Sequence, residues 1–404
     1  FPKNTEVEVT LTFTSEDTEG GWVRSVAPRA DAVTVRQHFS FVELPEPGFE
    51  AREALPGAGY FGPSFVDYAA PLGEPLLTRL IARHRLEKRD PDAAVSQPVE
   101  PIVYYLDPGT PEPVRSALIE GAEWWDQAFE AAGYQGAFRV EILPEDADPM
   151  DLRYNMIQWV HRSTRGWSYG STVSDPRTGE ILKGHVSLGS LRVRQDYLIA
   201  EALLAPYREG DEVSTEVEAM ALARIRQLSA HEVGHTLGLA HNYIASAQGR
   251  ASVMDYPHPS VWLDGDGAPD VTDAYATGIG AWDKVAIEYG YQDFPPGVDE
   301  KGALAAILSE ARAEGITFLS DQDARPTSSA HPEAHLWDNN SDAVTELGRV
   351  MEVRRAALDR FGANVIREGE PLATMEEALV PLFLYHRYQV EAAIKVVGGV
   401  RYDY

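Results

Sequence analysis

Three histidines and one glutamate stand at a spacing that could hold a metal ion and activate water. His231 and His235 are four residues apart, and Glu232 lies between them. Side chains four residues apart on an α-helix share a face, so both imidazoles can bind one ion about 2 Å away. Gly238 can adopt a positive φ and turn the chain, which brings His241 back to the same ion. Three protein ligands leave a fourth position for water, so the pattern predicts a catalytic zinc site.

The same residues belong to a longer pattern, His-Glu-x-x-His-x-x-Gly-x-x-His, which is followed by a methionine turn at residues 252–257 (SVMDYP). This pattern resembles the signature of the metzincin zinc endopeptidases. The resemblance implies one catalytic Zn²⁺, with Glu232 as the general base and a protein or peptide as the substrate. It also implies that Met254 forms a hydrophobic floor under the metal without binding it. An amphipathic helix with structural histidines is the alternative.

Tyr256 stands two residues after the methionine, where astacins and serralysins also have a tyrosine. That resemblance implies that Tyr256 reaches the zinc or the oxyanion of the transition state. Asn242 follows the third histidine, whereas astacins have Glu there and serralysins have Pro. Two interpretations of Tyr256 therefore stay open, a catalytic residue and a wall of the specificity pocket.

Periodicity divides the chain into three segments. Residues 1–95 alternate apolar and polar residues in several stretches, which predicts a β-rich accessory or pro-like domain. Residues 96–295 are the expected metzincin-like catalytic domain, with a twisted mixed sheet behind a long zinc helix. Residues 296–404 are mainly helical by periodicity, and the charged segment 83–90 is typical of a linker. The strands of the catalytic domain are expected at 102–106, 138–142 and 154–160, and its helices at 111–132, 214–239 and 281–291. The predicted fold class is α+β.

The edge strand of the expected sheet is assigned to residues 166–173, which precede a turn. In the metzincin clan this strand pairs antiparallel with an extended substrate, a case of β-augmentation. An ordinary hairpin strand is the alternative. The predicted substrate-binding residues are Trp167, Ser168, Tyr169, Gly170 and Ser171.

Composition limits the classes of function. The 404 residues include 63 acidic and 35 basic ones, for a formal net charge of -28, and no cysteine. The acidic surface repels nucleic acid and anionic membranes, and the absence of cysteine excludes disulfides and thiolate metal sites. The longest apolar run, 378–385, is far shorter than a membrane span. The chain starts at Phe1 without a signal peptide, so we expect a mature or trimmed product. The metzincin resemblance implies export, to the periplasm, the cell surface or the medium.

The whole chain also resembles large bacterial zinc-dependent metalloproteases that embed a metzincin domain between extra segments. The stretches that carry this resemblance are 100–134, 175–197 and 335–350. The sequence therefore predicts a zinc-dependent endopeptidase. Two other classes stay open, a zinc-loaded but latent or non-proteolytic binding module and a zinc hydrolase of a non-peptide amide. The intact Glu232 favours an enzyme over a binding module.

Two weaker patterns could bind further metal ions. One pattern repeats the His-x-x-x-His spacing and has acidic residues nearby: His331, His335, Asp321, Asp323 and Asp338. A helix start with solvated histidines is the favoured interpretation of this pattern. The second is an acidic loop that departs from the EF-hand pattern, so a surface turn is favoured over Ca²⁺ binding: Asp264, Asp266, Asp270 and Asp273.

Overall fold

The computed structural model describes the chain apart from residues 1–2, 17–20, 163–166, 209–213 and 296. The chain forms two compact units, Phe1–Gly48 and Phe49–Tyr404. The boundaries predicted at residues 95 and 295 stay predictions.

The first unit is an antiparallel hairpin of β1 (Asn4–Thr14) and β2 (Ala32–Val42), with the short helix α1 (Gly21–Val26) between them. Alternation along the strands gives the hairpin one apolar face. Val7 pairs with Phe39 on this face, and Leu11 pairs with Val35. This arrangement agrees with the period-two pattern of the sequence.

The second unit is built on a five-stranded sheet with the order β6-β5-β7-β9-β8. Its strands are β5 (Ile102–Leu106), β6 (Phe138–Ile142), β7 (Asn155–Val160), β8 (Tyr169–Ser174) and β9 (Ile181–Gly189). β5 is parallel to β6 and β7, and β7 is parallel to β9, whereas β8 is antiparallel to β9 and stands at the end of the order. The predicted mixed sheet is therefore confirmed.

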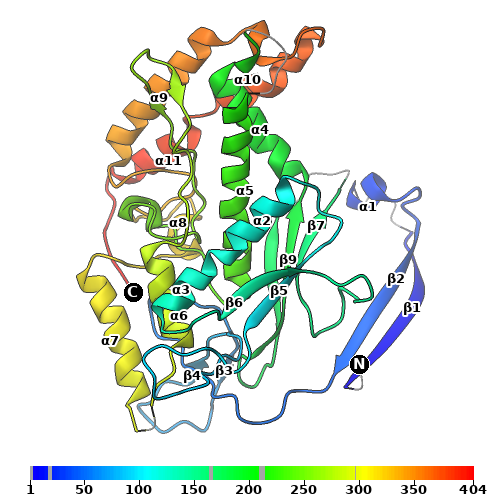
Figure 1. The fold of residues 1–404 in the computed structure, drawn as a ribbon, viewed down its shortest axis with the longest axis vertical. Helices are drawn as coiled ribbons and strands as arrows, with labels where there is room; N and C mark the ends of the chain where they lie inside the picture. Colours follow the sequence, from blue (N-terminus) through cyan, green and yellow to red (C-terminus); the bar gives the residue numbers. More distant parts are fainter. Residues whose placement is uncertain (1–2, 17–20, 163–166, 209–213, 296) are drawn as a thin grey trace. The chain divides into compact units, whose positions relative to one another are not determined.

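Four helices position the candidate site: α2 (Val114–Glu123), α3 (Trp125–Ala131), α5 (Thr215–Thr236) and α6 (Ala281–Tyr291). α2 packs against α5 (Figure 1), and α5 also contacts β8 and β9. α5 begins after Ser214, whose Oγ accepts a hydrogen bond from the Glu216 N–H. It ends three residues earlier than the predicted 239, because Gly238 adopts φ +103° and turns the chain. The single helix predicted for 111–132 is two helices that meet at Trp124.

The remaining elements surround this core. The helices are α4 (Leu191–Leu204), α7 (Glu300–Ala313), α8 (Asp321–Ala324), α9 (Ala343–Arg360), α10 (Met375–Phe383) and α11 (Arg387–Lys395). Short 3-10 turns lie at Pro206–Arg208, Ala245–Gln248, Ala363–Val365 and Leu372–Thr374. Two small hairpins pair β3 (Ser64–Val66) with β4 (Leu77–Arg79) and β10 (Trp262–Leu263) with β11 (Pro269–Asp270). α4 contacts α5, α9 and α10, so the C-terminal helices share a core with α5. The strands near the N-terminus and the helices near the C-terminus confirm the α+β class.

The predicted linker at residues 83–90 is instead packed into the second unit, so that prediction is wrong. Arg83, His84 and Lys88 are buried. His84 Nε2 lies 3.1 Å from both the Tyr104 hydroxyl and the Thr236 carbonyl oxygen. Charge alone suggested a solvated segment, but these charged and polar groups find partners inside the fold.

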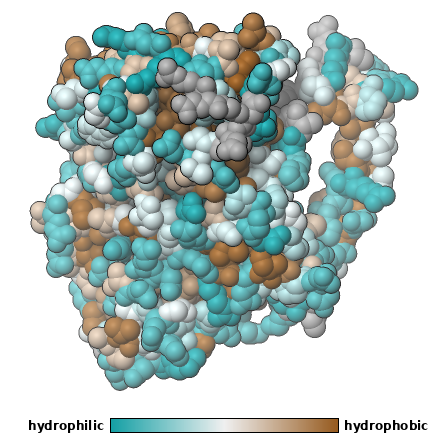
Figure 2. All heavy atoms as spheres, turned by 45° about the horizontal axis from the view of Figure 1, so that its top comes forward, coloured by the Kyte–Doolittle hydropathy of each residue, from teal (hydrophilic) through white to brown (hydrophobic). Residues whose placement is uncertain are grey.

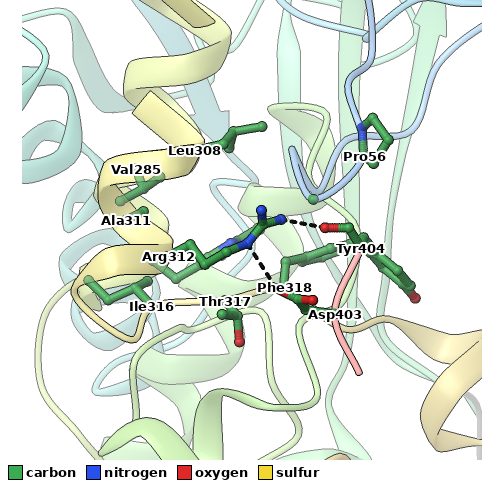
Figure 3. Close-up of a pocket in the computed structure, with 12 residues that line it drawn as sticks. Pro56, Val285, Leu308, Ala311, Arg312, Ile316, Thr317, Phe318, Asp403 and Tyr404 are labelled. Carbon is green, nitrogen blue, oxygen red and sulfur yellow. Dashed lines mark hydrogen bonds and ion pairs between the residues drawn. The ribbon is translucent and has the colours of Figure 1, made fainter. Parts of the chain in front are cut away.

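The last residues of the sequence lie against α7. Figure 3 shows the guanidinium of Arg312, a residue of α7, beside the last two residues. Its Nε lies 2.9 Å from Asp403 Oδ2, and its Nη2 donates to the Tyr404 carbonyl oxygen. The Tyr404 ring lies beside Phe318, with 5.9 Å between the ring centroids. The Tyr404 hydroxyl bonds to Asp323 of α8. The last two residues therefore connect α7 to α8 through hydrogen bonds and an ion pair.

Figure 2 shows a mostly hydrophilic face with scattered hydrophobic patches, as the acidic composition leads one to expect. No helix in the described ranges has both the length and the apolar character needed to cross a membrane.

Candidate metal centre

The structure brings together the three histidines that the sequence selects. His231 and His235 lie one turn apart near the end of α5, with 4.8 Å between their ring centroids. After the turn at Gly238, His241 returns to them, with ring centroids 4.6 Å from His235 and 5.3 Å from His231. One nitrogen of each ring lies within 4.8 Å of the others. Three imidazole nitrogens at this separation can bind one ion.

Hydrogen bonds fix the orientation of all three rings. Each Nδ1 has an oxygen partner at 2.8 Å: the Val253 carbonyl for His231, the Leu239 carbonyl for His235 and the Asp321 carboxylate for His241. A neutral imidazole that donates through Nδ1 keeps a lone pair on Nε2. The three Nε2 atoms are therefore the ones available to a metal ion.

Burial and charge favour the neutral form of His231 and His235. The Nε2 atoms of His231 and His241 are buried and have no hydrogen-bond partner among the described residues. Burial, with the neighbouring histidines, lowers the pKa of His231 well below its ordinary value and that of His235 to about 4. Neutral imidazoles with buried, unpaired lone pairs are a donor set that fits Zn²⁺.

Glu232 lies beside this cluster in a desolvated position. Its side chain is buried, and this burial raises its pKa to about 8, against the opposing effects of Arg224 and the Gly170 N–H. Gly170 belongs to the edge strand β8. A Cβ at Gly170 would lie 2.2 Å from the Glu232 carbonyl oxygen. Glycine at this position therefore allows β8 to approach the zinc helix.

The methionine turn packs under the histidines. Met254 is fully buried, and a Cβ at Gly234 would lie 2.3 Å from Met254 Sδ. Gly234 lies between the two helical histidines, so the thioether contacts the helix directly at the level of the site. This position is consistent with the floor that the resemblance implies.

Asp283 of α6 holds the start of this turn, and the sequence interpretation missed it. Its carboxylate accepts hydrogen bonds from the Ser252 hydroxyl at 2.6 Å and from the Val253 and Gly280 N–H groups at 2.8 Å. The aspartate is fully buried in the helix that was expected to close the domain. A charged residue on an otherwise apolar helix face is the one signal in the sequence that could have identified it.

Tyr256 lies against the histidine cluster. Its ring centroid is 4.8 Å from that of His241 and 5.2 Å from that of His231, and Trp337 stacks on it at 5.3 Å. Its hydroxyl accepts a hydrogen bond from Arg325 Nη2 at 3.2 Å. This position is compatible with both interpretations of Tyr256, as a catalytic residue and as a pocket wall.

Asp321 has a different place from the one the sequence suggested. It was considered as an oxygen ligand of a second metal site, but it accepts the His241 Nδ1–H and contacts Arg325. Burial alone would raise the pKa of Asp321, yet the hydrogen bonds and charges of these two partners hold it well below its ordinary range. Nothing in the local sequence marks Asp321 as a partner of a histidine 80 residues away.

The other members of that weak pattern do not converge. His331 and His335 are buried, and α9 begins only at Ala343, so the predicted helix start with solvated histidines is wrong. Asp323 bonds to tyrosines near the end of the chain, and Asp338 accepts a hydrogen bond from Ser246. Among the described residues, only the triad of His231, His235 and His241 brings three or more potential ligands close enough to share an ion.

The acidic loop forms the turn between β10 and β11. Asp264 Oδ1 accepts hydrogen bonds from the N–H groups of Asp266 and Ala268, at 2.9 and 2.7 Å. Calcium binding there stays a prediction.

The predicted substrate-binding residues lie on and just before β8. Trp167 is 86 % exposed and Tyr169 is about half exposed, whereas Gly170 faces the zinc helix. Ser168 accepts a weak hydrogen bond from the Gly189 N–H at 3.4 Å, and Ser171 donates one to the His185 carbonyl at 3.4 Å. Residue 166, the first of the predicted strand, is outside the described residues. Substrate binding by this strand stays a prediction.

Comparison with known families agrees with this geometry. Residues 214–404 match a family model described as Met-zincin, and residues 1–89 match a domain of unknown function (DUF5117). No curated protein and no solved structure matches the chain significantly. The Met-zincin match includes the three histidines, Glu232 and Met254. Residues 214–404 are therefore similar to the Met-zincin family, and this similarity suggests a zinc metallopeptidase-like fold for that part of the chain.

Proposed function

We propose that the chain is a zinc-dependent endopeptidase that hydrolyses extended protein or peptide substrates. One observation supports this proposal above all. The histidine cluster has two buried Nε2 atoms without partners, and a buried carboxyl group lies beside it on the same helix. A structural metal site has no need of such a neighbouring base, whereas hydrolysis does.

His231, His235 and His241 would hold the ion through Nε2. When bound, Zn²⁺ polarises the scissile carbonyl and lowers the pKa of water. The Glu232 carboxylate accepts a proton from the attacking water and later delivers it to the nitrogen of the leaving amine. In the catalytic interpretation of Tyr256, its hydroxyl donates a hydrogen bond to the oxygen that gains charge.

The edge strand supports an extended substrate. β8 pairs with β9 on one side and stands at the end of the sheet order. A peptide can add to such an edge through backbone hydrogen bonds, which tolerate many side chains. The contact of Gly170 with Glu232 places this edge next to the proposed general base. Export of the protein, which the clan resemblance implies, belongs to the same proposal.

Cleavage mapping with a proteome-derived peptide library tests the proposal. The samples are the zinc-loaded wild type, the chelated wild type, Glu232→Ala and the matched control Glu218→Ala, an exposed glutamate on the same helix. We expect the wild type and Glu218→Ala to cleave alike. Chelation and Glu232→Ala should abolish cleavage, while Glu232→Ala still binds one zinc ion.

The alternatives predict other results. A zinc-loaded wild type that cleaves no peptide would favour a binding module or a hydrolase of non-peptide amides, which a panel of acylated amines then separates. Stronger cleavage after removal of residues 1–48, the first compact unit, would indicate latency. Cleavage that survives in Glu232→Ala would contradict the general-base role.

A further inference from the structure

The third histidine differs from the other two in its hydrogen-bond partner. His231 and His235 donate to backbone carbonyl oxygens, whereas His241 donates to the carboxylate of Asp321 on α8. Hydrogen bonds to a charged acceptor are shorter and stronger than those between neutral groups. A carboxylate partner also raises the basicity of an imidazole that binds metal. His241 is the ligand that lies beyond the end of α5, where no helix geometry holds it.

Arg325 connects this carboxylate to Tyr256. Its Nε contacts Asp321 Oδ1, one helical turn away. Its Nη2 donates to the hydroxyls of Tyr243, at 2.6 Å, and Tyr256, at 3.2 Å. The guanidinium also lies over both rings, 5.4 and 5.2 Å from their centroids. One arginine thus contacts the carboxylate that orients His241 and the phenol of Tyr256.

We propose that Asp321 and Arg325 are positioning residues of the metal centre. Asp321 holds His241 in the tautomer that presents Nε2, and Arg325 fixes both that carboxylate and the Tyr256 hydroxyl. The proposal rests on the proposed function because it takes the histidines to be metal ligands. It gives the region after residue 295 a direct part in the site. The Leu319 N–H bonds to the Asn242 side chain, and the Trp337 N–H bonds to the Tyr256 carbonyl, so this region contacts the site on two further sides.

Zinc affinity tests the role of Asp321. The full chain is titrated with zinc against a chromogenic chelator of known affinity, which requires no peptidase activity. We expect Asp321→Asn to weaken zinc binding about 10- to 100-fold. The matched control is Asp323→Asn, because Asp323 lies on the same short helix but bonds to Tyr402 and Tyr404. Wild-type affinity in Asp321→Asn, or an equal loss in both variants, would overturn the proposal.

Arg325→Met is a second test of the positioning role, because it removes the contact of Arg325 with Asp321 and leaves His241 unchanged. It should weaken zinc binding less than Asp321→Asn does, and should add little in the Asp321→Asn background. The control is Arg401→Met, which breaks an exposed ion pair with Glu333. Circular dichroism and thermal melting of the metal-free proteins establish that each variant is folded. An Arg325→Met variant with wild-type zinc affinity would contradict the link between Arg325 and the metal centre.

A double-mutant cycle tests the contact with Tyr256. Arg325→Met should lower kcat in the wild type and have a much smaller effect in the Tyr256→Phe background, with KM little changed in both. Additive losses would overturn the link to Tyr256. If the protein binds zinc but cleaves nothing, the proposed function fails, while the zinc titrations still decide whether Asp321 and Arg325 position the site.

Discussion

The carbonyl oxygen of Val253 accepts the Nδ1–H of His231 at 2.8 Å, so the residue before Met254 sets the orientation of the first histidine. The same carbonyl accepts a second hydrogen bond, from Gln227 Nε2 at 2.9 Å. Gln227 lies one turn before His231 on α5. The methionine turn is therefore attached to the zinc helix by polar bonds as well as by the contact between Met254 and Gly234.

Asp283 extends this connection to α6. It accepts the Val253 N–H, and burial raises the pKa of its carboxyl group from an ordinary value of 3.8 to about 6. Between pH 3.8 and about pH 6, the carboxyl group of Asp283 has lost its proton in the unfolded chain but keeps it in the folded chain. Stability therefore falls as pH rises from about 4 to about 6, and it stays lower above that range.

We predict that Asp283→Asn removes this part of the pH dependence. The free energy of unfolding of the wild type, minus that of Asp283→Asn, should fall by about 2 kcal/mol between pH 4 and pH 7. Denaturant titrations with a constant excess of chelator measure it, and groups that titrate in both proteins cancel in the difference. A difference that is constant over this range, or that grows with pH, would show that Asp283 is not held protonated by burial.

Gly234→Ala tests the packing of Met254 under the site. The new Cβ would lie 2.3 Å from Met254 Sδ and 2.6 Å from Trp125 Cζ2, so the turn or the indole must move. Overpacking of this kind costs about 1–3 kcal/mol, more than the ~1 kcal/mol that alanine gains over glycine in a helix.

We therefore expect Gly234→Ala to be less stable than the wild type in denaturant titrations. Met254→Ala should recover part of the loss in the double variant. Gly348→Ala is the matched control, because Gly348 lies in α9 with nothing within 4 Å of the added carbon, and it should be neutral or stabilising. A Gly234→Ala protein as stable as the wild type would contradict the tight contact.

Tyr256→Phe separates the two interpretations of this residue. If the hydroxyl stabilises the oxyanion, kcat should fall about 10²- to 10³-fold while KM and zinc content stay near those of the wild type. If the ring only lines a pocket, kcat should be unchanged and the cleavage preference should shift. Steady-state kinetics on a peptide found by cleavage mapping gives both quantities, with zinc content measured on the same samples.

The histidine cluster could be predicted from the sequence because its arrangement is local. His231, His235 and Gly238 obey helix geometry and the freedom of glycine in φ, and His241 follows within three residues. The strands at 102–106 and 138–142 also have the predicted bounds, since alternation over a few residues indicates a strand on its own.

The supporting residues could not be predicted, because tertiary contacts select them. Asp321 is 80 residues from His241, and Asp283 is 30 residues from Val253. The break at Trp124 has no proline to mark it, and Gly121 lies inside α2. The break precedes Trp125, whose indole donates to the Ala230 carbonyl of α5 at 2.8 Å. A buried charge, or a helix that bends to meet another helix, becomes visible only once the partners are in place.

Gly170→Ala tests whether the edge strand must touch the zinc helix for catalysis. The added Cβ would meet the Glu232 carbonyl oxygen at 2.2 Å and His235 Cβ at 2.9 Å, and neither is the end of a flexible side chain. β8 must therefore move away from α5, which shifts the edge proposed to bind substrate relative to Glu232.

We expect kcat/KM to fall at least about 10-fold, the effect of ~1.4 kcal/mol in the barrier. Zinc content should be unchanged, because no histidine loses its Nδ1 partner. Gly265→Ala is the control, since its added carbon has nothing within 4 Å, and it should retain wild-type kinetics. Unchanged kcat/KM in Gly170→Ala would mean that the substrate does not depend on the position of β8, and would favour the interpretation of this strand as an ordinary hairpin strand.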